Sequence, residues 1–168
     1  MGKGGIGHWT VDSRVMQMRI PSLDVYSWID IAAGDSRMPE SFQRFIAAWE
    51  LVVAWHRAEH PTETTDAKLK QRLAQYLPEL DLAEDDDWMQ AVSGLLPWEV
   101  VQMAGGNPTA ISRRVAGPTD WVGLVDVLYT IRCNLLKGGK SPSDPRDLAL
   151  TGVAADVTLL IGRALHGV

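Results

Sequence analysis

The sequence predicts an all-α fold, a bundle of about five helices. Apolar residues recur at steps of three and four along several long segments, which is typical of amphipathic helices. No segment shows a convincing alternation of apolar and polar residues, and no internal repeat of about 20–50 residues is present. With 168 residues, 46% of them hydrophobic, the chain is long enough for one domain with a substantial core.

We expect residues 1–39 to form an N-terminal extension and residues 40–168 to form a helical domain. The extension is rich in glycine at its start and contains Pro21, Gly34 and Pro39. This pattern predicts at most one short helix there, near residues 23–33.

Two helices and a helix start are predicted in the first half of the domain. The first helix covers about residues 40–60 and ends at Pro61, with an apolar stripe of Phe42, Phe45, Ile46, Trp49, Val52 and Val53. The second begins after Thr65 and ends before Pro78, with leucines at every fourth position. The acidic residues 81–87 predict a loop and the first turn of another helix, where carboxylates interact favourably with the helix dipole.

The second half begins with residues 97–118, which contain three prolines and three glycines and predict an irregular connection around a short helix at residues 98–104. Thr119 or Asp120 is expected to cap a strong helix that ends at Gly138 and Gly139. A last helix is predicted over about residues 146–165, with its core side formed by Leu148, Val153, Val157, Leu160, Ile161 and Ala164.

The net charge of −5 disfavours a nucleic-acid binder only on average. Residues 61–100 contain nine acidic and three basic side chains, whereas residues 101–168 contain five acidic and seven basic ones. A local basic site for phosphate is therefore compatible with the composition. The single Cys133 excludes an internal disulfide, and we recognise neither a signal peptide nor a membrane-spanning stretch, so a cytoplasmic location is expected.

Arg132 is the anomaly of the predicted 119–137 helix. On an ideal helix it lies about 40° from Leu128 and about 60° from Leu135, on the apolar stripe. An unpaired buried charge is costly, so Arg132 should be paired, line a pocket or lie at a subunit interface. Asp156, on the following helix, is one possible partner.

The run YTIRCNLLKGGKSPSDPRD, residues 129–147, resembles the signature region of the HEPN superfamily (higher eukaryotes and prokaryotes nucleotide-binding domains). The run FQRFIAAWELVVAW, residues 42–55, is similar to the first long helix of that family. The resemblance implies an HEPN-like all-α homodimer that acts on RNA as a metal-independent endoribonuclease, without a cofactor. It also implies a toxin–antitoxin, abortive-infection or CRISPR-linked defence setting, with an antitoxin or a nucleotidyltransferase as a further partner. We expect no membrane association, because the longest apolar stretch is too short to span a bilayer.

The family motif places three candidate catalytic residues. Arg132 matches its arginine, Asn134 matches an asparagine frequent two places later, and Lys137 stands where the family has histidine. Metal-free RNA cleavage needs proton transfer as well as positive charge on the phosphate, and lysine is a poorer base than histidine. The alternative is therefore a catalytically inactive HEPN-like module for RNA binding or protein assembly. Lys137 also suits the negative end of its helix dipole without any catalytic role.

Other histidines and tryptophans have plainer interpretations. His56 and His60 stand four apart on one helical face and could share a metal ion, but no third ligand completes a pattern, which favours solvated side chains. Trp49 and Trp121 are expected in the core. Trp9, Trp88 and Trp98 lie where no apolar stripe requires them and are candidates for a dimer or partner surface.

Overall fold

The computed structural model describes residues 33, 37–102, 111–137 and 140–168. This part of the chain is mostly helical, which confirms the all-α prediction at that level. Its five α-helices are α2 (Glu40–Glu59), α3 (Asp66–Tyr76), α4 (Asp86–Leu95), α5 (Trp121–Leu136) and α6 (Pro145–His166). Two 3₁₀ turns, Leu77–Glu79 and Leu82–Glu84, connect α3 to α4, and a small antiparallel sheet pairs β1 (Val100–Gln102) with β2 (Ile111–Arg113).

Side-chain caps set the starts of four helices. Thr65 accepts a hydrogen bond from the Lys68 amide at the start of α3, as its position in the sequence predicts. Aspartates do the same for the next three helices, with Asp85, Asp120 and Asp144 as their caps. The acidic stretch 81–87 thus forms a loop and then the first turn of α4, as predicted.

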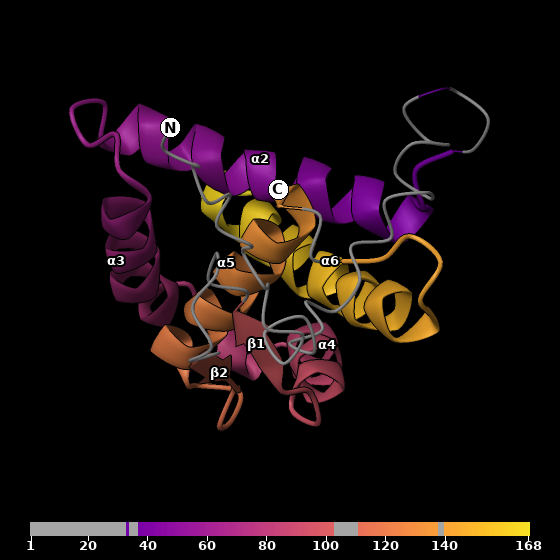
Figure 1. Ribbon diagram of the computed structural model, residues 1–168. Helices are drawn as coiled ribbons and strands as arrows, with labels where there is room; N and C mark the ends of the chain where they lie inside the picture. Colours follow the sequence, from indigo (N-terminus) through magenta and orange to yellow (C-terminus); the bar gives the residue numbers. More distant parts are fainter. Residues whose placement is uncertain (1–32, 34–36, 103–110, 138–139) are drawn as a thin grey trace, which may run out of the picture.

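Helix α2 lies across the bundle and packs along α6, as Figure 1 shows. Helix α5 occupies the centre of the view, with α3 against one side and the small sheet against another. Helix α4 packs against α6 on the side away from α2. The arrangement places the C-terminal end of α2, the start of α3 and the side of α5 around one region of the surface.

The core is formed by apolar side chains from every helix. The predicted stripe of α2 is confirmed, since Phe42, Phe45, Trp49 and Val52 are buried and Ile46 and Val53 pack against them half-buried. The stripe of α6 is rotated from the prediction. Its most buried apolar residues are Leu150, Ala154, Ala155, Val157 and Ile161, while Leu148, Val153, Leu160 and Ala164 lie at the edge of the core.

The prediction of a short helix at residues 98–104 and of no strand was wrong. Val100, Val101 and Gln102 form β1, whose register pairs Val100 with Arg113 and Gln102 with Ile111. Consecutive β-branched residues favour the extended backbone of a strand. Residues 103–110, between the strands, lie outside the described part of the chain.

One tryptophan differs in its role from the prediction. Trp88 is a core residue and not part of a surface, because its side chain is fully buried and stacks on Trp121, with ring centroids 5.5 Å apart. Trp98 is half-buried and lies under the guanidinium of Arg146. Trp9 lies outside the described residues, as does the short helix predicted near residues 23–33 apart from Ala33.

Helix α6 has the length and mean hydropathy, 1.6, of a candidate membrane-spanning helix. Core helices meet the same criterion, and α6 buries its apolar side against α2 and α4. The helix is therefore weak support for a membrane location.

Candidate functional site

Arg132 lies on the side of α5 that faces α2 and α3. Its guanidinium carbon is 5.8 Å from the ring centre of Trp49 and 5.9 Å from that of Tyr129, and its Nη1 is 3.6 Å from Oδ2 of Asp66. The Arg132 side chain keeps 25% of its surface exposed. Arg132 is therefore paired and also lines a pocket, which are two of the three settings that its position on the apolar stripe predicts.

The possible pairing of Arg132 with Asp156 does not form. Asp156 forms its ion pair with Arg44 of α2, and both of those side chains are about half exposed. Because α6 packs along α2, Asp156 meets α2 and not the face of α5 that carries Arg132.

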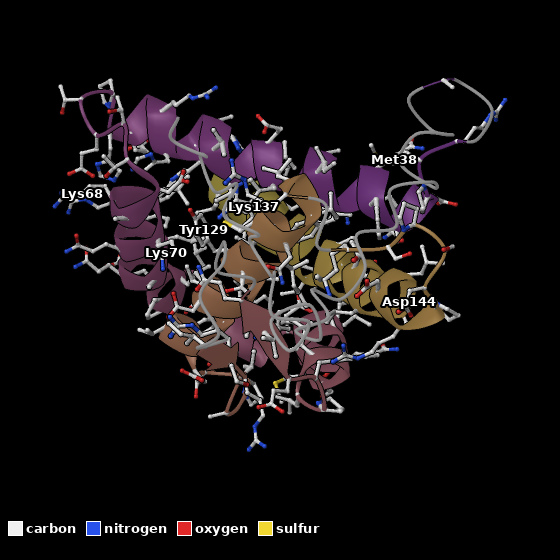
Figure 2. The ribbon with its side chains drawn as sticks, viewed as in Figure 1. Met38, Lys68, Lys70, Tyr129, Lys137 and Asp144 are labelled. Atoms are coloured by element: carbon white, nitrogen blue, oxygen red, sulfur yellow. The ribbon has the colours of Figure 1, made fainter. Side chains whose placement is uncertain are left out.

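Tyr129 connects the same face of α5 to the start of α3. Its hydroxyl donates a 2.7 Å hydrogen bond to Oδ2 of Asp66, and the ammonium of Lys70 lies 5.0 Å from its ring centre. Figure 2 shows Tyr129 and Lys70 between α5 and α3. Burial, and then hydrogen bonding to Asp66 and Cys133, raises the pKa of Tyr129, so this phenol remains a neutral donor over the physiological range.

Lys137 is exposed at the C-terminal end of α5 (Figure 2). Its backbone N–H donates hydrogen bonds to the carbonyls of Cys133 and Leu135. It follows Arg132 by five residues, about 140° around an ideal helix. One chain therefore presents Arg132 and Lys137 on different sides of α5. The predicted helix end at Gly138 and Gly139 lies outside the described residues.

Asn134 faces the opposite side of α5 from Arg132. It is 3% exposed, and its Nδ2 donates a 2.8 Å hydrogen bond to the carbonyl of Val101. This bond fastens β1 to α5 and gives Asn134 a structural role in one chain.

The other basic residues of the signature run also have partners. Lys140 is 5% exposed and forms a 2.7 Å ion pair with Asp147, whose second oxygen accepts from the Ser141 amide. Arg146 donates to the carbonyl of Glu99 and lies over the ring of Trp98. The run therefore does not supply a free cluster of cations beside Arg132.

A polar cleft of about 290 Å³ opens beside Arg132. The end of α2, the loop that follows it and the start of α3 form its walls, and Arg132 contributes from α5. Its lining residues are Glu50, Val53, His56, Arg57, His60, Pro61, Glu63, Thr64, Thr65, Asp66, Leu69 and Arg132. This volume is close to the lower end of small-ligand sites, which begins at ~300 Å³.

The two cleft histidines differ from the prediction of solvated side chains. His56 is only 4% exposed, and its Nε2 is buried without a hydrogen-bond partner, 3.7 Å from Oε2 of Glu63. The ring of His60 is half-buried, 5.5 Å from that of His56 and edge-on to Trp55 at 5.9 Å. Within the part of the chain that the structure describes, no group of three metal-ligating side chains is present.

Glu63 is an anion fixed by Arg72. The Arg72 guanidinium donates two hydrogen bonds to its carboxylate, at 3.0 Å and 2.6 Å. These bonds lower the pKa of Glu63 from its ordinary value of 4.5 to about 2. The cleft therefore holds a permanent negative charge next to His56.

The cleft itself was not predicted, although the sequence contains a signal for His56. This residue follows Trp49 by seven and Val52 by four, which places it on the buried stripe of α2. Asp66 and Tyr129 carry no comparable signal, because their contact joins segments 63 positions apart. Glu63 contacts His56 and Arg72 nearby in sequence, but it lies in the loop after α2, where no helical spacing identifies it.

Comparison of the chain with family models, with curated proteins and with solved structures finds no match.

Proposed function

We propose that the chain is an HEPN-like RNA-acting domain, a metal-independent endoribonuclease that works as a homodimer in a defence setting such as toxin–antitoxin or abortive infection. The observation that carries the proposal is the environment of Arg132. Its guanidinium is held by two aromatic rings and by one long ion pair, and it remains partly exposed at the edge of a polar cleft. A phosphate can therefore reach it.

Arg132 would stabilise the phosphate during cleavage. When the 2′-hydroxyl of RNA attacks the adjacent phosphorus, negative charge builds on the phosphate oxygens, and a guanidinium placed beforehand lowers the barrier. The rings of Trp49 and Tyr129 supply this placement without neutralising the charge.

A homodimer is supported by an exposed leucine beside a small apolar pocket on the other side of Arg132. The pocket, of about 50 Å³, is lined by Phe45, Ile46, Trp49, Leu135 and Leu136 with Glu50 and Arg132. Leu136 is 61% exposed and directly precedes Lys137. A second copy packed over Leu136 would bury this leucine and would bring its own Lys137 toward Arg132, which one chain cannot do. A lysine ammonium there can protonate the leaving oxygen but is a poor acceptor for the 2′ proton.

The second candidate is a catalytically inactive HEPN-like module that binds RNA or assembles with a partner such as an antitoxin or a nucleotidyltransferase. Two observations favour it. Lysine replaces the histidine of the family motif at position 137, and Asn134 is already bonded to β1.

One experiment separates the two candidates. The purified protein, Lys137→His, Arg132→Ala and the control Arg163→Ala are each incubated with structured RNA in EDTA. Cleavage by all but Arg132→Ala supports the endoribonuclease, and cleavage by Lys137→His alone indicates a disabled nuclease that serves as a binding module. No cleavage by any of the four proteins contradicts the catalytic proposal. A monomer in light scattering at micromolar concentration contradicts the homodimer.

A further inference from the structure

The proposed reaction lacks a group that accepts the 2′ proton, and the cleft beside Arg132 contains two imidazoles. An imidazole titrates close to neutral pH and both accepts and donates protons. His56 and His60 line the same cleft as Arg132, although they come from the last turn of α2 and its C-terminal cap and not from the signature run. The chain therefore places two histidines in the same cleft as Arg132, independently of the residue at position 137.

His56 has a buried polar atom without a hydrogen-bond partner at the wall of the cleft. Buried polar atoms in proteins nearly always have hydrogen-bond partners, and an exception calls for an explanation. His56 Nε2 is such an exception, in a side chain that is 5% exposed and lines the cleft. Glu63, the nearest carboxylate, is 3.7 Å away and is already engaged by Arg72.

His60 is the more accessible imidazole of the cleft. It caps the C-terminal end of α2, and its half-buried ring lies against the rings of His56 and Trp55. Two ring contacts restrict its rotation while part of its surface stays open to the cleft. His60 therefore combines access with a fixed orientation, whereas His56 lies deeper.

We propose that the cleft between α2, α3 and α5 is the phosphodiester site: Arg132 binds the RNA phosphate, His60 exchanges the proton, and His56 positions His60. This inference rests on the proposed RNA-cleaving function. It assigns proton transfer to the residue that caps α2 in the same chain, in place of the missing motif histidine.

The step balances as an internal transesterification. His60 accepts the 2′-hydroxyl proton while the 2′ oxygen forms a bond to phosphorus and the bond from phosphorus to the 5′ oxygen breaks. The leaving 5′ oxygen takes a proton from Lys137 of the second copy or from water. The products are a 2′,3′-cyclic phosphate and a 5′-hydroxyl end, with no oxidant, reductant or metal involved.

The charged groups around the imidazoles come from α2, the following loop, α3 and α5. They are three carboxylates, of Glu50, Glu63 and Asp66, and three guanidiniums, of Arg57, Arg72 and Arg132, so their formal charges cancel. Glu63 and Asp66 would stabilise a protonated imidazole once the 2′ proton has been accepted. Since Asp66 also pairs with Arg132, a phosphate has to replace that carboxylate to bind.

The binding half of the proposal is tested without cleavage. The imidazole proton resonances are followed by NMR while uridine 3′-monophosphate is added to the full chain. We expect the His60 and His56 resonances to shift, the His166 resonance of α6 to stay, and all shifts to disappear in Arg132→Ala. Unchanged His60 resonances with millimolar nucleotide overturn the assignment.

The proton-transfer half is tested with His60→Gln, His56→Gln and the control His166→Gln. We expect His60→Gln to lower kcat on the order of 100-fold with little change in KM, and His56→Gln to lower kcat less and to shift the pH profile. RNA cleavage at the wild-type rate by His60→Gln overturns the inference and leaves the proposed function standing. Absence of cleavage by the wild type, together with shifted His60 resonances, overturns proton transfer and the nuclease but supports the phosphate site.

Discussion

Arg132 and Asp66 form an ion pair that joins α5 to the first residue of α3, with 3.6 Å between Nη1 and Oδ2. The same oxygen of Asp66 accepts a 2.7 Å hydrogen bond from Tyr129. Because Asp66 is 54% exposed, water weakens its attraction for the guanidinium, and Tyr129 holds this carboxylate more directly than Arg132 does. Asp66 is thus a competitor that an incoming phosphate can displace.

Asp66→Asn should therefore strengthen RNA binding. The amide oxygen of asparagine can still accept from Tyr129, but it has no charge with which to hold Arg132. An exposed ion pair contributes up to about 1 kcal/mol, so we expect an affinity gain of about two- to fivefold. Fluorescence anisotropy with a 2′-O-methylated RNA measures it without cleavage. Asp156→Asn, which breaks a similarly exposed pair with Arg44, is the control. Unchanged or weaker binding by Asp66→Asn would argue against Arg132 as the phosphate contact.

Asn134→Ala should act on stability more than on chemistry. The change removes the donor to the Val101 carbonyl and leaves a small cavity, because the Asn134 side chain is buried, with 3% of its surface exposed. Loss of such a bond costs about 1–3 kcal/mol, which urea unfolding measures. Asn134→Asp keeps the shape but lacks the donor and should also be destabilised. If Asn134→Ala unfolds like the wild type but loses RNA cleavage, Asn134 belongs to the active site and our structural assignment is wrong.

The sequence predicted helices well where the signal was local. The start of α3 follows from Thr65 and Asp66, and the buried side of α2 follows from the spacing of Phe42, Phe45 and Trp49. In each case the signal lies within one or two turns of the helix that it predicts. Such patterns do not depend on which element packs opposite.

Features that depend on distant partners were not predictable in this way. β1 requires pairing with β2, nine or more positions later, and a three-residue strand has too little alternation to reveal itself. Arg132 could be identified as anomalous, but its partner Asp66 belongs to α3, far earlier in the sequence, and not to the helix that follows α5. The cleft unites α2, α3 and α5, so periodicity along any one helix could not show that His60 and Arg132 line the same site.

Substitutions at Trp88 should separate packing from hydrogen bonding. Its side chain is fully buried against Trp121, and its Nε1 has no hydrogen-bond partner. Trp88→Ala should cost about 3–5 kcal/mol through the cavity that it leaves. Trp88→Phe removes the unpaired N–H along with part of the ring, so the relief of desolvation offsets lost packing and we expect a cost of about 1 kcal/mol. Urea unfolding followed by far-ultraviolet circular dichroism measures both, with the half-buried Trp98 as the control position. If Trp88→Phe lowers the free energy of unfolding as much as Trp88→Ala does, removal of the unpaired N–H does not offset the lost packing.

Glu63→Gln should remove part of the acid sensitivity of folding. The bonds from Arg72 lower the pKa of Glu63 from 4.5 to about 2, so the folded chain keeps this carboxylate ionised where the unfolded chain already binds a proton. The resulting stabilisation is complete above pH 4.5 and is lost as the pH falls toward 2. We therefore expect the free energy of unfolding of the wild type to fall more steeply between those two values than that of Glu63→Gln, as measured by urea unfolding at a series of pH values. Glu59→Gln, at an exposed carboxylate near the same end of α2, should keep the steep wild-type dependence. Parallel curves for wild type and Glu63→Gln would mean that Arg72 does not hold Glu63 in solution, and the permanent negative charge next to His56 would then be absent at acid pH.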